Sequence, residues 1–180
     1  WAFDGTDWYY ADGSGALASG WRSVNGAWYW LDIANDNRMV TGFFSIGSNR
    51  YHFSSTGALS LGWFMSDGDW YYAEPSNASG IVKTGWLKDG SQYYYLDPAV
   101  DGKMLLGHFS VNGKSYYAKG SGAVACREWV DVQDSVQDGP SKAFAGSDCS
   151  LCGTLRNGKL FTSNGDGELV EARGFVTLGG

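Results

Sequence analysis

Aromatic side chains that recur seven residues apart are the groups in this sequence best suited to chemistry. The spacing joins two tryptophans in three places, Trp1 and Trp8, Trp21 and Trp28, and Trp63 and Trp70. The face of a tryptophan attracts a cation by roughly 0.5–2 kcal/mol per good contact, and its flat apolar surface also suits a sugar ring. Because Trp, Tyr and Phe make up 16% of the 180 residues, binding through rings is the first chemistry to consider.

Groups for catalysis or metal binding are scarce by comparison. The chain has 2 His and no Gly-x-Ser-x-Gly segment, so a nucleophilic triad is not expected. Most acidic residues occupy turns or loops, where Asp is favoured for backbone reasons. Cys149 and Cys152 have the C-x-x-C spacing of a metal or redox motif, but a zinc site would need a fourth ligand besides Cys126. We therefore expect no catalytic residue, no metal and no cofactor, and the chain is not expected to be an enzyme.

Charge and composition exclude further classes of protein. The chain carries 13 Lys and Arg against 19 Asp and Glu, for a net charge of −6, and it has no basic cluster. A nucleic-acid partner is not expected, because such binding needs a basic face. No apolar run approaches the roughly 18 residues of a membrane span. With 27 Gly, 3 Pro and many rings, the composition favours a turn-rich all-β chain over a disordered one.

A repeat of about 20 residues positions these rings. The repeats begin 20 to 23 residues apart, at Trp1, Trp21, Phe43, Trp63, Trp86 and His108, with Trp129 as the expected start of a seventh. A second aromatic block follows seven residues into each repeat. In five repeats a turn pair separates the two blocks, namely Asp4-Gly5, Asn25-Gly26, Asp67-Gly68, Asp89-Gly90 and Asn112-Gly113. Such pairs favour a type I′ turn, so each repeat is predicted to be a β-hairpin.

The hairpins must associate, because a single hairpin is only marginally stable in water. We predict an all-β fold, a solenoid of stacked β-hairpin repeats of about 20 residues with a degenerate C-terminal part. Of the 29 aromatic residues, 25 lie at or before Tyr117, which marks a change in composition. The predicted organisation is a repeat array at 1–129, a Cys-containing insertion at 130–152 and a degenerate terminal repeat at 153–180.

Two segments show the repeat most fully. Gly20-Trp21 is followed by Trp28-Tyr29-Trp30 and Met39-Val40-Thr41-Gly42, and Gly62-Trp63 by Trp70-Tyr71-Tyr72 and Val82-Lys83-Thr84-Gly85-Trp86. This pattern resembles the choline-binding or cell-wall-binding repeat of bacterial surface proteins, well over residues 1 to about 129 and poorly over 153 to 174. The resemblance implies a left-handed superhelix of hairpins with choline held between neighbouring repeats. It also implies a secreted, cell-wall-associated module with no chemistry of its own.

The resemblance, carried over position by position, implies which residues hold the ligand. Residues seven and nine places into a repeat share a strand face. The opening and seventh-place rings of one hairpin are therefore expected to meet the ninth-place ring of the next, above an apolar floor. The expected cages are Trp1, Trp8 and Trp30 over Leu17; Trp63, Trp70 and Tyr95 over Val82; Trp86, Tyr93 and Tyr117 over Met104; and, departing from the pattern, Trp21 and Trp28 over Met39 with His52 as third ring.

Other positions in the repeat are expected to be structural. The middle aromatic residue of each block points away from the cage face, so a core role is favoured for Tyr9, Tyr29, Tyr51, Tyr71, Tyr94 and Tyr116. The repeats that open at Phe43 and His108 offer Arg50 and Ser115 at the seventh place. These two repeats are expected to serve as spacers or as half of a neighbour's site.

The hypothesis that follows is a non-catalytic cell-wall-binding module that recognises choline of teichoic or lipoteichoic acid through aromatic cages. Two alternatives stay open, a platform for an α-glucan or another wall polysaccharide, and a structural or adhesive spacer whose rings are all buried. The chain opens directly on Trp1 and ends at Gly180, so we expect a fragment that tethers a separate domain of a longer protein. In an exported protein we expect one disulfide, from Cys126 to Cys149 or Cys152, with one thiol spare.

Overall fold

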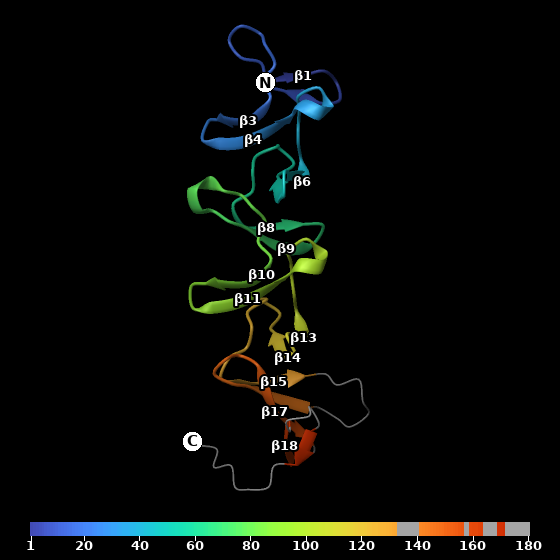
Figure 1. Cartoon of the computed structure of the whole chain (residues 1–180), viewed down its shortest axis with the longest axis vertical. Helices are drawn as coiled ribbons and strands as arrows, with labels where there is room; N and C mark the ends of the chain where they lie inside the picture. The colour runs from blue at the N-terminus through green and yellow to red at the C-terminus, as the bar shows by residue number, and fades with distance from the viewer. Residues whose placement is uncertain (133–140, 157–158, 164–168, 172–180) are drawn as a thin grey trace. The chain divides into compact units, whose positions relative to one another are not determined.

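The computed structural model describes residues 1–132, 141–156, 159–163 and 169–171. The chain forms two compact units, the first made of Trp1–Gly85 and Leu96–Met104, and the second of Trp86–Tyr95 and Leu105–Gly180. Small antiparallel sheets make up both units, and the described residues contain three short 3-10 helices and no α-helix (Figure 1). No helix in these ranges has the length and apolar character needed to cross a membrane.

The first unit is a series of antiparallel hairpins. Its strands are β1 (Ala2–Phe3), β2 (Trp8–Tyr9), β3 (Gly20–Val24), β4 (Ala27–Asp32), β5 (Arg38–Met39), β6 (Gly42–Ile46), β7 (Asn49–Phe53), β8 (Gly62–Ser66), β9 (Asp69–Ala73) and β12 (Lys103–Met104). The 3-10 helices η1 (Ile33–Asn35), η2 (Ser76–Ala78) and η3 (Pro98–Val100) lie in the longer connecting loops. These are the loops in which the longer repeats carry their extra residues, so the added length does not interrupt a strand.

The Asn-Gly and Asp-Gly pairs form the predicted turn in three of the five hairpins. Both residues have positive φ at Asn25-Gly26, Asp67-Gly68 and Asn112-Gly113, as a type I′ turn requires. At Asp4-Gly5 and Asp89-Gly90 only the glycine has positive φ, so the prediction of a type I′ turn is wrong there. At the first of these, the Asp4 carboxylate instead accepts hydrogen bonds of 2.8 Å from the backbone N–H groups of Thr6 and Asp7.

Aromatic rings stack the hairpins of the first unit on one another. Trp21 of β3 packs against Tyr51 of β7 with ring centroids 5.2 Å apart, and Phe43 of β6 packs against Tyr71 of β9 at 4.9 Å. Tyr51 also belongs to a buried cluster with Val40 and Phe53, and Phe53 is completely buried. The predicted all-β fold of hairpin repeats is therefore confirmed.

The second unit combines hairpins with a larger sheet. Its strands are most of β10 (Gly85–Asp89) and β11 (Gln92–Asp97), then β13 (Gly107–Val111), β14 (Lys114–Ala118), β15 (Glu128–Val132), β16 (Ser141–Ala145), β17 (Leu151–Arg156), β18 (Lys159–Ser163) and β19 (Leu169–Glu171). Strands β15 to β19 form one antiparallel sheet in chain order. Trp129, the expected start of a seventh repeat, lies in β15 and pairs with Phe144 of β16.

A disulfide joins the two parts of the second unit. Cys126 bonds to Cys149, with Cα atoms 4.1 Å apart, so one of the two expected pairings is present. Cys149 is buried and packs in a cluster with Phe109 and Tyr116 of the hairpin β13–β14. The side chain of Cys152 lies outside the described residues, as does much of the segment 153–180 that we expect to be a degenerate repeat. The expected boundaries at 129 and 152 stay predictions.

Candidate ligand-binding site

The two faces of each hairpin carry different rings. In β3–β4, Trp21 pairs across the strands with Trp30, and Arg22 pairs with Tyr29. Since successive side chains of a strand point to opposite faces, Trp21, Trp28 and Trp30 share one face while Tyr29 lies on the other. The ring of Trp21 contacts Tyr51 of the next hairpin, and Tyr51 lies eight places into its repeat. The face of one hairpin that carries its opening residue therefore packs against the face of the next hairpin that carries its eighth-place residue.

This stacking defines a recurring group of three side chains. We call it an aromatic frame: the opening residue and the seventh-place residue of one hairpin, together with the eighth-place residue of the next. Frames are numbered by the repeat that supplies the opening residue. The first frame consists of Trp1, Trp8 and Tyr29, the second of Trp21, Trp28 and Tyr51, the third of Phe43, Arg50 and Tyr71, and the fifth of Trp86, Tyr93 and Tyr116.

The first frame lines part of an open cavity in the first unit. The cavity has a volume of about 420 Å³ and is lined by Trp1, Trp8, Tyr29, Met39, Ser55 and Thr56. The rings of Trp1 and Tyr29 lie edge to face, with centroids 4.8 Å apart and planes 66° apart. Trp1 and Trp8 are 44% and 46% exposed, so a ligand can reach both rings. No carboxylate lines the cavity, so a ligand cation there would face rings and hydroxyl groups.

The Met39 side chain can extend to the cavity because the neighbouring loop has a glycine, Gly57, where it packs on this side chain. Its strand β5 pairs with the end of β4, where Met39 lies opposite the buried Leu31. Gly57 in the following loop packs directly on the Met39 side chain, and a Cβ atom at Gly57 would overlap the Met39 sulfur. Gly57 also has a φ of 80°, a conformation that favours glycine. The thioether thus contributes a polarisable wall next to the rings.

The second frame repeats the geometry of the first. Trp21 lies edge to face with Trp28, at 6.3 Å and 84°, and with Tyr51, at 5.2 Å and 71°. The backbone N–H of Leu59 donates a 2.7 Å hydrogen bond to the carbonyl oxygen of Trp28, which ties the following loop to this strand. Tyr51 is only 8% exposed, whereas Trp21 and Trp28 are exposed. The open side of the second frame therefore consists of the two indoles.

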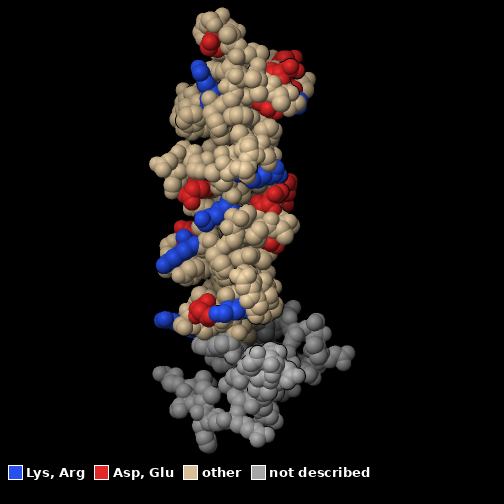
Figure 2. All heavy atoms as spheres, in the orientation of Figure 1, with Lys and Arg blue, Asp and Glu red and all other residues tan. Residues whose placement is uncertain are grey.

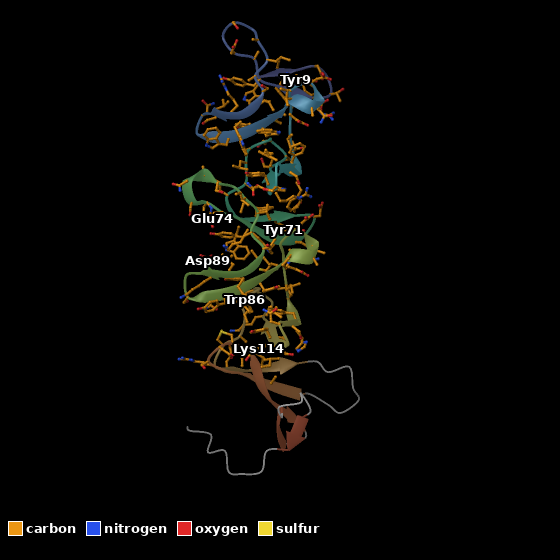
Figure 3. The ribbon with its side chains drawn as sticks, viewed as in Figure 1. Tyr9, Tyr71, Glu74, Trp86, Asp89 and Lys114 are labelled. Atoms are coloured by element: carbon orange, nitrogen blue, oxygen red, sulfur yellow. A yellow bond between two sulfur atoms is a disulfide. The ribbon has the colours of Figure 1, made fainter. Side chains whose placement is uncertain are left out.

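The fifth frame shows the same arrangement in the second unit. Trp86 and Tyr116 lie edge to face, with centroids 4.8 Å apart and planes 70° apart (Figure 3 labels Trp86). The backbone N–H of Val124 donates a 2.7 Å hydrogen bond to the carbonyl oxygen of Tyr93. The ammonium nitrogen of Lys88 lies 5.6 Å from the centre of the Tyr93 ring.

Charge is dispersed around these rings. On the face shown in Figure 2, acidic and basic side chains lie in small groups separated by uncharged surface. The ion pairs of the structure include Lys103 with Asp69 at 2.8 Å in the first unit and Lys114 with Asp148 at 2.9 Å in the second. The described residues contain no group of three or more His, Cys, Asp or Glu arranged to hold a metal ion.

The structure corrects the third ring expected in the first group. Tyr29 lies against Trp1, whereas Trp30 packs against Trp21 of its own hairpin at 5.3 Å and against the buried cluster of Val40. Met39 takes the place expected for Leu17, which is 50% exposed. Trp1 and Trp8, the expected opening and seventh-place rings, both line the cavity. The following hairpin places its eighth-place ring against Trp1, and not the expected ninth-place ring, because hairpins that stack in one direction oppose unlike faces.

The same shift of one residue occurs in the group that opens at Trp21. Tyr51, and not His52, lies against Trp21, and Met39 lines the cavity of the first frame. His52 stacks on Phe64 of the next hairpin at 4.4 Å, and its Nδ1 atom is hydrogen-bonded to Ser60 Oγ at 2.8 Å.

In the second unit Tyr116, and not Tyr117, lies against Trp86. Tyr117 pairs with His108 in its own hairpin and packs on a different buried cluster. Met104, its expected floor, belongs to the first unit, so that contact stays a prediction.

The expected group of Trp63, Trp70 and Tyr95 also contains residues of both units, so it stays a prediction. Val82, its expected floor, is buried in the first unit, where its N–H donates to the Arg50 carbonyl at 2.8 Å.

The middle tyrosines also occupy positions in the frames. Tyr29 lines the cavity, and Tyr51 and Tyr116 hold equivalent positions against Trp21 and Trp86. Their burial fits the expected core role, but each also supplies one wall of a frame. The alternation of strand faces, combined with stacking in a single direction, is the signal that could have found them.

Comparisons with known proteins agree with this arrangement. The sequence model of a cell wall binding repeat matches residues 1–17, 19–32, 41–59, 62–76 and 84–99. No curated protein sequence matches the chain significantly. Among solved structures, choline binding protein F from Streptococcus pneumoniae, crystallised with a peptidoglycan analogue, is 34% identical over 84% of this chain, with a TM-score of 0.69.

Two further structures are similar. CbpJ from Streptococcus pneumoniae is 29% identical, with 94% of this chain and 57% of that chain covered and a TM-score of 0.72. The modular autolysin LytC from Streptococcus pneumoniae shares the fold, at 24% identity over 91% of this chain and 36% of that one, with a TM-score of 0.55. The chain spans less than half of the choline binding protein F chain, 45% of its length.

Proposed function

The chain belongs to the cell wall binding repeat family, and from this we propose that it is a non-catalytic module that binds choline on teichoic or lipoteichoic acid. The repeats of this family and their choline-binding relatives support cell-wall or choline binding in general terms. Choline as the ligand, the secreted and wall-associated location, and a separate domain tethered by the module are parts of the proposal.

The cavity of the first frame is the observation that carries the proposal. Two exposed indoles, a phenol ring and a thioether surround about 420 Å³ of space with no carboxylate among its walls. A quaternary ammonium ion has no hydrogen-bond donor on nitrogen, so aromatic faces attract it without the competition from hydrogen bonding that a primary amine meets. Such a cage is suited to a trimethylammonium group.

The ring geometry favours a cage over a sugar platform. The ring planes in the first, second and fifth frames are 66° to 84° apart. Sugar stacking needs one flat, accessible ring face, whereas rings set edge to face enclose a rounded group. The exposed indoles of Trp1, Trp8, Trp21 and Trp28 also argue against a spacer whose rings are all buried.

Binding at one frame is expected to be weak, because a cation–π contact contributes only about 0.5–2 kcal/mol. Teichoic acid is a polymer, so several frames in one chain can bind it together. Linked sites raise the overall affinity by roughly 10²–10⁴ without any new contact when the geometry allows simultaneous binding. The repeat architecture thus fits a repetitive ligand.

A fluorescence titration tests the proposal. We expect a saturable change in tryptophan fluorescence with choline and with tetramethylammonium, and none with glucose oligomers. Trp8→Ala should remove part of the change, while Ile33→Ala, which truncates an exposed apolar side chain on η1 outside the cavity lining, should leave it intact. A response to glucose oligomers alone would reassign the module to carbohydrate binding.

A further inference from the structure

The third frame differs from the first, second and fifth at two positions, because it opens with Phe43 where they have a tryptophan and its seventh-place residue is not aromatic. The hairpin β6–β7 has Arg50 at the seventh place, where the first, second and fifth frames have Trp8, Trp28 and Tyr93. Its other features are those of a frame. Phe43 and Tyr71 lie edge to face at 4.9 Å and 69°, and the Val82 N–H donates to the Arg50 carbonyl at 2.8 Å.

These values match the other frames closely. The corresponding ring pairs lie at 5.2 Å and 71° in the second frame and at 4.8 Å and 70° in the fifth. The corresponding loop hydrogen bonds, from Leu59 to Trp28 and from Val124 to Tyr93, are both 2.7 Å. The backbone of the third frame and the placement of its two rings therefore match the frames proposed to bind ligand, with a phenyl ring in the place of the opening indole.

A cation of the protein itself lies on the ring of this frame. The Cζ atom of Arg50 is 5.3 Å from the centre of the Phe43 ring. Nη2 pairs with Asp101 Oδ2 at 3.2 Å, and Nη1 donates to Ser45 Oγ at 3.2 Å. The Nε atom is buried and has no hydrogen-bond partner among the described residues, which fits an N–H group close to an aromatic face.

The geometry points to Arg50 as a built-in cation that fills the third aromatic frame and keeps a quaternary ammonium ligand out of it. This inference rests on the proposed function, because it assumes that equivalent frames bind such a cation. The guanidinium uses the ring face that a ligand cation would need, and its charge repels a second cation. Asp101 and Ser45 hold the guanidinium in place, so the third frame binds no ligand while the equivalent frames do.

An ion pair alone does not account for this placement. Arg50 and Asp101 are partly exposed, and pairs of that kind add little to stability. A lysine or arginine serving only Asp101 would not need to lie over Phe43. Replacement of Arg50 by an aromatic residue should therefore complete the frame, because Phe43, Tyr71 (labelled in Figure 3) and the backbone of Val82 already stand in position.

Calorimetric titration of the whole chain with tetramethylammonium tests the inference. Arg50→Trp and Arg50→Tyr should each bind one more equivalent than the unmodified chain, and Arg50→Lys, which keeps the charge, should bind no more. Far-ultraviolet circular dichroism and thermal unfolding verify that each variant is folded. An unchanged number of sites in folded Arg50→Trp and Arg50→Tyr would overturn the inference.

A second measurement needs no variant. Crystals of the unmodified chain soaked in tetramethylammonium should show the ion at the first frame and none at the third frame, and an ion bound in the third frame beside Arg50 would contradict the inference. The two proposals fail in different ways. If the unmodified chain binds no tetramethylammonium, the proposed function fails. If it binds but the aromatic variants gain nothing, only the role of Arg50 fails.

Discussion

At the scale of single residues, neighbouring positions in one strand have separate tasks. Tyr29 packs against Trp1 of the preceding hairpin and lines the cavity, whereas Trp30 packs against Trp21 of its own hairpin. Both are large aromatic residues, so composition does not distinguish them. The direction of the side chain, which alternates along the strand, decides which ring can touch a ligand.

Tyr29→Ala and Trp30→Ala form a matched pair that tests this division. Loss of the Tyr29 ring should weaken choline binding at the first frame about five- to tenfold, since about 1 kcal/mol of cation–π attraction disappears. Trp30→Ala should lower the unfolding temperature but leave that affinity within about twofold. The methyl resonance of Met39, which lines the same cavity, reports binding at this frame alone. Stronger loss of affinity from Trp30→Ala would contradict the assignment.

His52 predicts how stability depends on pH. Burial among aromatic rings lowers the pKa of His52 below its ordinary value, and the charge of Asp67 acts in the opposite direction. The folded state thus disfavours the protonated imidazole more than the unfolded state does. The stabilising contribution is complete above the unfolded pKa of about 6.5 and is lost as the pH falls toward the lowered folded pKa.

Urea unfolding at several pH values between about 7.5 and 5 measures this effect. The midpoint should fall as the pH is lowered, and His52→Phe should flatten that part of the profile. His52→Phe keeps a ring beside Phe43 and Phe64 and removes the titrating group. An identical pH dependence in the variant and in the unmodified chain would show that His52 is not responsible.

At the scale of elements, turn chemistry and strand pairing explain why each repeat is a hairpin. The type I′ turn of β3–β4 needs positive φ at both Asn25 and Gly26. A tight turn of this kind fixes the register, and the register places the opening ring opposite the ninth-place ring. In every other repeat whose Asn-Gly or Asp-Gly pair adopts this turn, the turn fixes the register in the same way.

Gly26→Ala isolates the contribution of backbone conformation. A Cβ atom at Gly26 would meet no atom within 4 Å, so the only cost is the φ of 83°. We expect destabilisation by about 1–2 kcal/mol, measured by urea unfolding. Gly13→Ala is the control, because a Cβ there is equally free of contacts and its φ is not in the positive range. Equal effects of the two substitutions would refute the turn argument.

At the scale of the whole molecule, repetition made much of the fold predictable. Turn pairs and ring spacing predicted the hairpins, and the expected opening and seventh-place rings of the first group both line the cavity of the first frame. The third ring could not be found from a single hairpin, because it depends on which face the next hairpin presents. The choice of Cys149 over Cys152 also depends on packing, since Cys149 lies buried against Phe109 and Tyr116.

The disulfide is expected to stabilise the second unit selectively. Cys126 and Cys149 are 23 residues apart in sequence, and closing a loop of this size contributes about 3 kcal/mol. Cys149→Ser should therefore speed amide hydrogen exchange in β13 and β14 and leave exchange in β6 and β7 unchanged. Cys152→Ser, which retains the Cys126–Cys149 bond, is the control. Equal acceleration in both units would contradict a local role.

We propose that these aromatic frames recognise a positive charge, and a comparison of two ligands measures the contribution of that charge. Calorimetric titration of the unmodified chain with choline is set beside titration with its neutral isostere, in which a carbon atom replaces the quaternary nitrogen. Both ligands have the same shape and apolar surface. Cation–π recognition predicts saturable binding of choline at least about fivefold tighter than binding of the isostere. Equal affinities, or no binding of choline, would show that the frames do not recognise a positive charge.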